Sequence, residues 1–188
     1  RRQAQWWHKY PEHKIVDLRG NVNTRMQKLQ ENDWNGAIFA AAGLERLNIN
    51  LENSISLDWM IPAPAQGAML VVAMADNQFV KDAVAELNDI ETEICTYIER
   101  QFLKTLEGGC TAPIGALARY NEEKDTIEFK GVLFSIDGKQ KIEIEKDVDI
   151  SEWKKLGFYS AKEILDNGGV KLMEEIKAQI KKNTSTSL

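Results

Sequence analysis

One cysteine and a group of arginines are the residues of this chain best suited to chemistry. Cys110 follows two glycines in the run Leu-Glu-Gly-Gly-Cys-Thr, where the sequence predicts a turn between a long helix and a strand. Glycines allow positive φ angles and leave space beside the sulfur, so the pattern favours a thiol presented on a loop for covalent chemistry. The alternative is an inert, partly buried thiol, which is the commoner fate of a free cysteine.

Five of the seven arginines fall in the first 46 residues, whereas lysine carries most of the positive charge elsewhere. These five are Arg1, Arg2, Arg19, Arg25 and Arg46. The planar guanidinium group binds carboxylates through paired hydrogen bonds, so this segment favours a carboxylate or phosphate site. A set of unrelated surface ion pairs explains the composition equally well.

Composition is that of an ordinary globular protein, because 43% of the 188 residues are hydrophobic and 28% are charged. The longest apolar runs are too short to span a membrane and no signal peptide is visible, so a cytoplasmic location is expected. The net charge of −5 argues against general nucleic-acid binding. No metal site is predicted, because the two cysteines lack ligand spacing and His8 and His13 lack a third ligand.

The first 64 residues have the pattern of an open parallel α/β sheet. Residues 14–18 and 37–42 are expected to be strands, separated by a helix whose N-cap is Asn21 or Asn23. Ligands bind such sheets beyond the carboxyl ends of the strands and beside helix N-termini. The arginines at or just past these ends are Arg19, Arg25 and Arg46.

A proline-rich crossing at residues 61–67 is the best candidate for a domain boundary. A buried strand is expected after it at residues 68–75, followed by helices at residues 78–87 and 90–106. The second helix carries an apolar stripe. Cys95 lies beside that stripe and is interpreted as an inert thiol.

Three strands are expected next, at residues 114–120, 126–136 and 139–146, with an Asp-Gly hairpin turn between the last two. Alternating apolar residues in the third strand are typical of an antiparallel sheet with one face in solvent. Two helices, at residues 159–167 and 170–182, complete this region. The predicted fold class is therefore α/β, with open sheet segments followed by an α+β domain that has a three-stranded antiparallel sheet and helices.

Five motifs, in this order and at this spacing, resemble the porphobilinogen deaminase (hydroxymethylbilane synthase) family. They are Arg-Arg-Gln-Ala-Gln at residues 1–5, Leu-Arg-Gly-Asn-Val-Asn-Thr-Arg at 18–25, Ala-Ala-Ala-Gly-Leu-Glu-Arg-Leu at 40–47, Pro-Ala-Gln-Gly-Ala at 64–68 and Leu-Glu-Gly-Gly-Cys at 106–110. The second and fifth motifs are highly specific as a pair, and the resemblance covers nearly the whole chain.

The resemblance implies a transferase of porphyrin and heme biosynthesis that condenses four porphobilinogen units head to tail into hydroxymethylbilane and releases ammonia at each step. It implies a dipyrromethane cofactor joined by a thioether to Cys110. The carboxylates of these pyrroles would be bound by arginines: Arg1, Arg2, Arg19 and Arg25 for the cofactor, and Arg25 and Arg46 for the substrate. Asn21 and Gln66 match positions near the pyrroles, although a simple helix cap explains Asn21 at least as well.

The family's catalytic aspartate belongs to an N-terminal domain that no segment here matches. No catalytic residue is therefore assigned to this chain, and the chain alone is expected to be inactive. On the family's plan, residues 1–64 end domain two, residues 65–89 return to domain one, residues 90–183 form domain three and residues 184–188 are a disordered tail. The returning strand would need partner strands, so the expected partner is an N-terminal segment of the same protein, with the complete protein a monomer. No nucleic acid or membrane partner is expected.

Two other functions fit parts of the sequence. Open α/β domains also serve as non-catalytic carboxylate-binding modules. A loop cysteine such as Cys110 can also serve in thiol-based redox regulation. A stable adduct of two pyrrole units on that cysteine would favour the enzyme over both alternatives.

Overall fold

The computed structural model of the chain describes residues 1–49, 52–107 and 112–185. By its internal contacts the chain divides into two units. The smaller unit is His13–Asp58, and the larger unit combines Arg1–Glu12 with Trp59–Leu188. Each unit is described by itself below.

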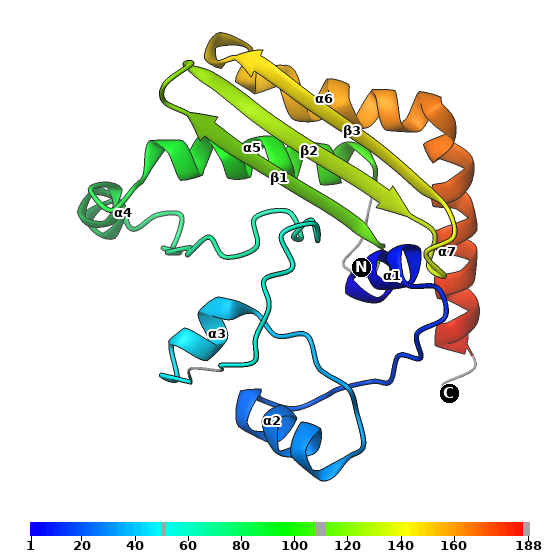
Figure 1. The fold of residues 1–188 in the computed structure, drawn as a ribbon. Coiled ribbons are helices and arrows are strands. Elements are labelled where there is room, and N and C mark those ends of the chain that lie inside the picture. The colour runs from blue at the N-terminus through cyan, green and yellow to red at the C-terminus, as the bar shows by residue number, and fades with distance from the viewer. Residues whose placement is uncertain (50–51, 108–111, 186–188) are drawn as a thin grey trace. The chain divides into compact units, whose positions relative to one another are not determined.

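A three-stranded antiparallel sheet in the order β1-β2-β3 organises the larger unit (Figure 1). Its strands are β1 (Ile114–Asn121), β2 (Thr126–Phe134) and β3 (Lys141–Asp149). Between β2 and β3 the chain turns at Gly138, whose φ of +74° is a conformation that glycine adopts readily. The three expected strands and the Asp-Gly hairpin are thus confirmed, with ends shifted by up to three residues.

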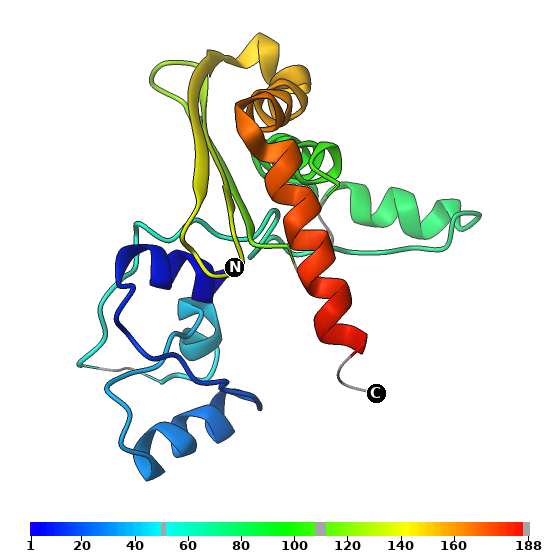
Figure 2. The ribbon, with the colours of Figure 1, turned by 90° about the vertical axis from the view of Figure 1, so that its right-hand side faces the viewer.

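Helices cover one face of this sheet, as the edge-on view in Figure 2 shows. They are α5 (Ile90–Thr105), α6 (Trp153–Ile164) and α7 (Val170–Ser185). A 3-10 turn, Ile150–Glu152, precedes α6, and a kinked stretch, Leu165–Gly169, joins α6 to α7. The first of the two expected C-terminal helices therefore begins six residues earlier than residue 159, and the second extends through two residues of the expected tail.

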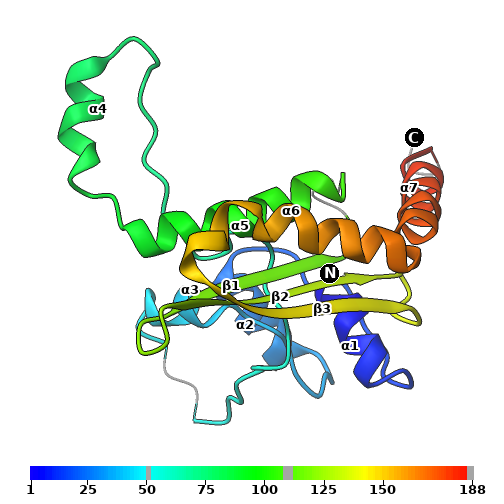
Figure 3. The ribbon, with the colours of Figure 1, turned by 90° about the horizontal axis from the view of Figure 1, so that it is seen from above.

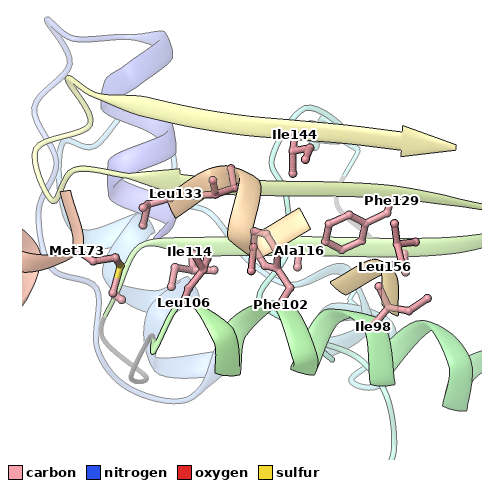
Figure 4. Packing of buried hydrophobic residues seen from close by; sticks show 14 of the residues in the cluster. Ile98, Phe102, Leu106, Ile114, Ala116, Phe129, Leu133, Ile144, Leu156 and Met173 are labelled. Carbon is pink, nitrogen blue, oxygen red and sulfur yellow. The ribbon is translucent and has the colours of Figure 1, made fainter. Parts of the chain in front are cut away.

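The sequence of α5 explains both its boundaries and its place against the sheet. Asp89 caps the helix by accepting a hydrogen bond from the Thr92 amide at 2.7 Å. From the buried face of α5, Ile98, Phe102 and Leu106 point into the core (Figure 4), and none is more than 1% exposed. Burying each such side chain contributes about 1.5–3 kcal/mol, so this face fixes α5 on the sheet.

Two glycines allow α5 to approach its neighbours closely. A Cβ atom on Gly131 of β2 would lie 2.6 Å from the Phe102 ring. A Cβ atom on Gly157 of α6 would collide with the backbone carbonyl of Ile98. Larger residues at these positions would therefore force the helix, the sheet or both to shift.

The remaining helices are shorter. In the larger unit these are α1 (Arg2–Lys9) and α4 (Gln78–Ala85), and in the smaller unit α2 (Val22–Glu31) and α3 (Ala41–Glu45). α1 packs through Ala4 on Val132 and Phe134 of β2. Among the described residues, none of the helices has the apolar length that crossing a membrane requires.

Three expected strands are not formed. Residues 14–18 and 68–75 contain no strand, and residues 37–42 run into helix α3 from Ala41 onwards. A strand requires a neighbour to accept and donate its backbone hydrogen bonds, and in the described part of the chain only β1, β2 and β3 provide such neighbours for one another. The mixed helix-and-sheet class is confirmed, whereas the parallel arrangement expected for these three segments is not seen.

Residues 68–75 leave their apolar side chains in solvent. Leu70 is 69% exposed and Val72 is 79% exposed, and in the helix that follows Phe79 is 82% exposed. In the view from above, α4 stands apart from the sheet and from the helices that cover it (Figure 3). The expectation of a buried strand here is therefore wrong for this chain taken by itself.

Candidate functional site

Cys110, the residue predicted to carry covalent chemistry, lies outside the described residues, together with Gly108 and Gly109. The residues on both sides of this gap are anchored. Leu106, directly after α5, is 1% exposed, and Ala112, before β1, is 9% exposed. Both belong to the core cluster, so the core holds the chain at Leu106 and at Ala112.

Two of the residues predicted to bind the cofactor contact each other although they lie 65 positions apart. The guanidinium Nη2 of Arg1 donates to the side-chain oxygen Oε1 of Gln66 at 2.7 Å. The same oxygen accepts from the Ala63 amide at 3.2 Å, which ties the Gln66 side chain back onto its own turn. The start of α1 and the turn after the proline-rich crossing therefore form one polar surface.

Gln5, which no sequence pattern singles out, strengthens this connection. It is 3% exposed, and its side-chain amide pairs with the backbone of Ile61 as a strand residue would. Gln5 Nε2 donates to the Ile61 carbonyl at 2.9 Å, while the Ile61 amide donates to Gln5 Oε1 at 2.8 Å. Arg1 Nη1 donates to that same carbonyl at 2.7 Å. Gln5 belongs to the Arg-Arg-Gln-Ala-Gln motif, but the motif does not reveal its pairing with Ile61, which lies 56 positions away.

The two arginines at the start of the chain lie at a helix N-terminus, as the resemblance implied. Arg1 is the N-cap residue of α1 and Arg2 is its first residue. Burial, followed by the positive charge of Arg2, lowers the pKa of Arg1 to about 10. Two adjacent guanidinium groups at the positive end of a helix dipole favour an anion nearby, because a carboxylate would relieve the repulsion between them.

In the smaller unit, the N-cap assignment of Asn21 is confirmed. Its side-chain oxygen accepts hydrogen bonds from the Thr24 amide at 2.8 Å and from the Thr24 hydroxyl at 2.9 Å. Gly20, with φ of +122°, makes the sharp turn that leads the chain into α2. These contacts account for Asn21 as a helix cap, and a pyrrole contact for it stays a prediction.

Arg25 is a predicted site residue with an unsatisfied hydrogen-bond donor. It lies in the first turns of α2, and its Nε atom is buried without a hydrogen-bond acceptor. A buried donor left unsatisfied costs roughly 1–3 kcal/mol. An anionic ligand at this guanidinium would remove that cost.

Arg19 and Arg46 are exposed. Arg19 pairs with Asp17 at 3.3 Å, and both side chains are largely in solvent, so the pair contributes little to stability. Arg46 is the C-cap residue of α3. The structure places both in the smaller unit, but not at the ends of strands, because the strands expected at residues 14–18 and 37–42 are not formed.

The charge balance of the five arginines fits an anionic ligand. Among the described residues, the ion pairs include Arg19 but not Arg1, Arg2, Arg25 or Arg46. Each guanidinium group that lacks an acidic partner among the described residues is suited to a carboxylate ligand, and the Nε donor of Arg25 is buried and unsatisfied. Surface ion pairing, the alternative explanation for the arginine-rich segment, therefore accounts for one arginine of the five.

The interpretation of Cys95 as an inert thiol is supported. It is half-buried in α5 against the core. Burial, followed by the negative charge of Glu99, raises its pKa, which disfavours the reactive thiolate. Nδ1 of His8 lies 2.8 Å from the Gly138 carbonyl oxygen, within hydrogen-bonding distance. Within the described ranges, no group of three side chains that could hold a metal ion is found.

Sequence reasoning missed Glu99, a buried carboxylate beside the turn that carries Gln66. It is 5% exposed and accepts hydrogen bonds from the backbone amides of Ala65 and Ala118. One signal was present, because Cys95, Glu99, Phe102 and Leu106 follow the spacing of one helix face. An acidic residue on an apolar face indicates a buried polar partner.

Two family models match the chain. "Porphobilinogen deaminase, dipyromethane cofactor binding domain" matches residues 1–82, and "Porphobilinogen deaminase, C-terminal domain" matches residues 93–166. The first model spans Arg1, Arg2, Arg19, Arg25 and Arg46 together with Asn21 and Gln66. Cys110 falls within the second match.

Curated relatives agree with these matches. The chain is 38% identical to "Porphobilinogen deaminase" of Carboxydothermus hydrogenoformans, over 94% of this chain and 57% of the relative. It is 35% identical to "Probable porphobilinogen deaminase" of Methanosarcina acetivorans, over 97% of this chain and 58% of the relative. For "Porphobilinogen deaminase" of Thermus thermophilus the identity is 35%, over 94% of this chain and 59% of the relative. The chain thus spans less than three-fifths of the length of these relatives, and it belongs to the porphobilinogen deaminase family.

Proposed function

We propose that this chain is the cofactor-carrying part of an enzyme that condenses four porphobilinogen units into hydroxymethylbilane with release of ammonia. The observation that carries the proposal is that Arg1, Arg2, Arg25 and Arg46 form no ion pair with the acidic residues that the structure describes, and that the Nε atom of Arg25 is buried and unsatisfied. A growing chain of pyrroles bears acetate and propionate groups, and these are the anions such a set can bind.

The residues present fit a dipyrromethane. Cys110 would hold it through a thioether, and Arg1, Arg2, Arg19 and Arg25 would bind its carboxylates, with Arg25 and Arg46 serving the incoming substrate. Gln66 would keep Arg1 oriented through their 2.7 Å hydrogen bond. When bound, the dipyrromethane supplies the pyrrole to which the first substrate unit is joined.

The residues of this chain would bind and orient the pyrrole carboxylates, and would not carry out the acid–base step of the condensation. Among the motif residues, the guanidinium groups of the arginines act as hydrogen-bond donors and positive charges toward carboxylates. We assign the acid–base step to an aspartate in a segment upstream of Arg1, in keeping with the family resemblance. This chain alone would then be inactive.

We further propose that this upstream segment is the structural partner of residues 65–89, which would belong to domain one, between residues 1–64 of domain two and residues 90–183 of domain three. The exposed apolar side chains of residues 68–75 and of α4 support this, because Met69 is 91% exposed and Phe79 is 82% exposed. The upstream segment would supply strands that pair with residues 68–75 and would bury these side chains.

Reconstitution tests the proposal. The chain is co-produced with the N-terminal two-fifths of the Carboxydothermus relative, and ammonia release from porphobilinogen is measured. We expect activity from the combination and none from the chain alone. Arg25→Leu should reduce kcat/KM roughly ten- to hundredfold, the loss expected for a charge-assisted hydrogen bond.

Arg119→Leu is the matched control, because Arg119 is an exposed arginine of β1 outside the predicted site. It should leave the activity unchanged. Equal losses from the two variants would contradict the carboxylate-binding role. A combination that binds porphobilinogen without releasing ammonia would instead favour a non-catalytic carboxylate-binding module.

A further inference from the structure

Glu99 of α5 is, among the described residues, the acidic side chain that is buried. Its carboxylate does not form an ion pair there; instead each oxygen accepts a backbone amide. Oε2 accepts from Ala65 at 2.5 Å, and Oε1 accepts from Ala118 of β1 at 2.9 Å. One side chain therefore connects three parts of the larger unit, namely the turn at residues 63–67, the helix α5 and the sheet.

The turn is held in part by its own hydrogen bonds, because the Gln66 amide donates to the Ala63 carbonyl at 2.9 Å and the Ala63 amide donates to Gln66 Oε1 at 3.2 Å. Ala65 has φ of +58°, a left-handed conformation that is strained for a residue with a Cβ atom. Beside the turn lies a cavity of about 330 Å³, whose lining includes Gly67, Cys95 and Tyr120. On that side the hydrogen bond from the Ala65 amide to Glu99 ties the turn to α5, in addition to the hydrogen bonds within the turn.

The next residue after Ala65 is Gln66, whose side chain holds the Arg1 guanidinium at 2.7 Å. The turn is also held from the side of α1, where Gln5 pairs with Ile61. A contact chain thus runs from Glu99 through Ala65 and Gln66 to Arg1.

We propose that Glu99 is a positioning residue: by fixing the turn at residues 63–67, it holds Gln66 and Arg1 in the orientation that receives a pyrrole carboxylate. The inference rests on the proposed function for its ligand, and it adds a residue that does not itself touch that ligand. Glu99 acts through the backbone, whereas Gln66 and Arg1 act through their side chains.

The electrostatics of Glu99 agree with this role. Burial raises its pKa, while the two amide donors and the positive charge of Arg100 oppose the rise. Two accepted hydrogen bonds use both oxygens as acceptors, which a carboxylate can provide and a side-chain amide cannot. Glu99→Gln keeps the size of the side chain but turns one acceptor into a donor that faces a backbone amide.

Hydrogen exchange tests the anchor directly. In the chain with Glu99→Gln, exchange at the Ala65 or Ala118 amide should accelerate roughly tenfold or more, as expected when a hydrogen bond to a charged acceptor is lost. The matched control is Glu93→Gln, which alters an exposed glutamate of the same helix that bonds only locally, to Asn88. Unchanged exchange at both amides in Glu99→Gln would overturn the anchor.

Binding of porphobilinogen, measured by titration calorimetry on the chain co-produced with its N-terminal segment, tests the positioning role. We expect Glu99→Gln to weaken binding about tenfold and Gln66→Ala to do the same. Because both act on one contact chain, the double variant should lose little more than either single variant. A purely structural effect of Glu99 would instead add to that of Gln66→Ala, and additive losses would overturn the proposal.

Different results would contradict the proposed function and the positioning role of Glu99. In that case the wild-type protein would neither bind porphobilinogen nor carry a pyrrole adduct, whatever the exchange data show for Ala65. Wild-type binding together with unaltered binding in Glu99→Gln would overturn the positioning role alone.

Discussion

The region from α5 to α7 and the smaller unit, His13–Asp58, differ in how they bury their side chains. In the first region the core contains residues with almost no exposure, such as Phe102, Phe129 and Ile176. In the described part of the smaller unit no residue is buried to that degree, and its helices α2 and α3 contain none that is buried. Three of the five predicted site arginines lie in this less buried unit.

This difference indicates that the two regions have different roles. The α5–α7 region contains the core cluster, which includes Leu106 and Ala112 on the two sides of Cys110. The smaller unit supplies charge, and the hydrogen bonds that hold it are mostly local, such as the cap between Asn21 and Thr24. Perturbations should therefore cost much more free energy of unfolding in the first region than in the second.

The largest effect is expected from emptying the core. Phe102→Ala removes a fully buried ring that packs edge-on against Phe129 at 5.3 Å between ring centroids. We expect a loss of about 3–5 kcal/mol in urea denaturation of the chain. The matching change in the smaller unit, Leu29→Ala on the partly buried face of α2, should cost under about 1 kcal/mol. Equal costs would contradict the distinction between the regions.

A smaller effect is expected from filling a close approach. Gly157→Ala would place a methyl group against the backbone carbonyl of Ile98, so α6 must move away from α5. We expect a cost of about 1–3 kcal/mol, measured by the same denaturation. Gly36→Ala is the control in the smaller unit, where an added Cβ would meet no atom within 4 Å. If Gly36→Ala were the more damaging change, the smaller unit would be packed more tightly than described.

The smallest effect is a difference in pH dependence between the N-cap of α5 and the N-cap of α2. The amide of Thr92 donates to Asp89 and lowers the pKa of that carboxyl below 3.8, whereas the Asn21 cap of α2 does not titrate. Because the folded-state pKa is depressed, the Asp89 cap stabilises α5 above the unfolded value and is lost as the pH falls through the folded value. In NMR the Thr92 amide should titrate with a midpoint below 3.8, and the Thr24 amide should not. A midpoint above 3.8 would contradict the cap.

The parts of the fold that the sequence predicted well are those with partners nearby in the chain. The start of α5 at Ile90, the hairpin at Gly138 and the helix from Val170 all follow from local patterns of capping, turn chemistry and apolar spacing. The start of α6 at Trp153 was missed because Gly157, a poor helix former, lies in its second turn. The apolar run at residues 68–75 predicts a strand that is not formed, because no strand among the described residues pairs with it.

For the site, sequence motifs selected the arginines and Gln66, but not the contacts that orient them. Arg1 meets Gln66, and Glu99 meets Ala65, through separations of 65 and 34 positions. No local pattern encodes such contacts, since they depend on how α1, the turn and α5 are packed. Glu99 was identifiable only as a carboxylate on an apolar helix face.

Intact-mass spectrometry of the chain co-produced with its N-terminal segment tests the central claim most directly. The account predicts an added mass of two pyrrole units, located on Cys110 by peptide mapping, lost in Cys110→Ser and retained in Cys95→Ser. An unmodified chain from an active preparation, or an adduct that survives Cys110→Ser, would contradict it.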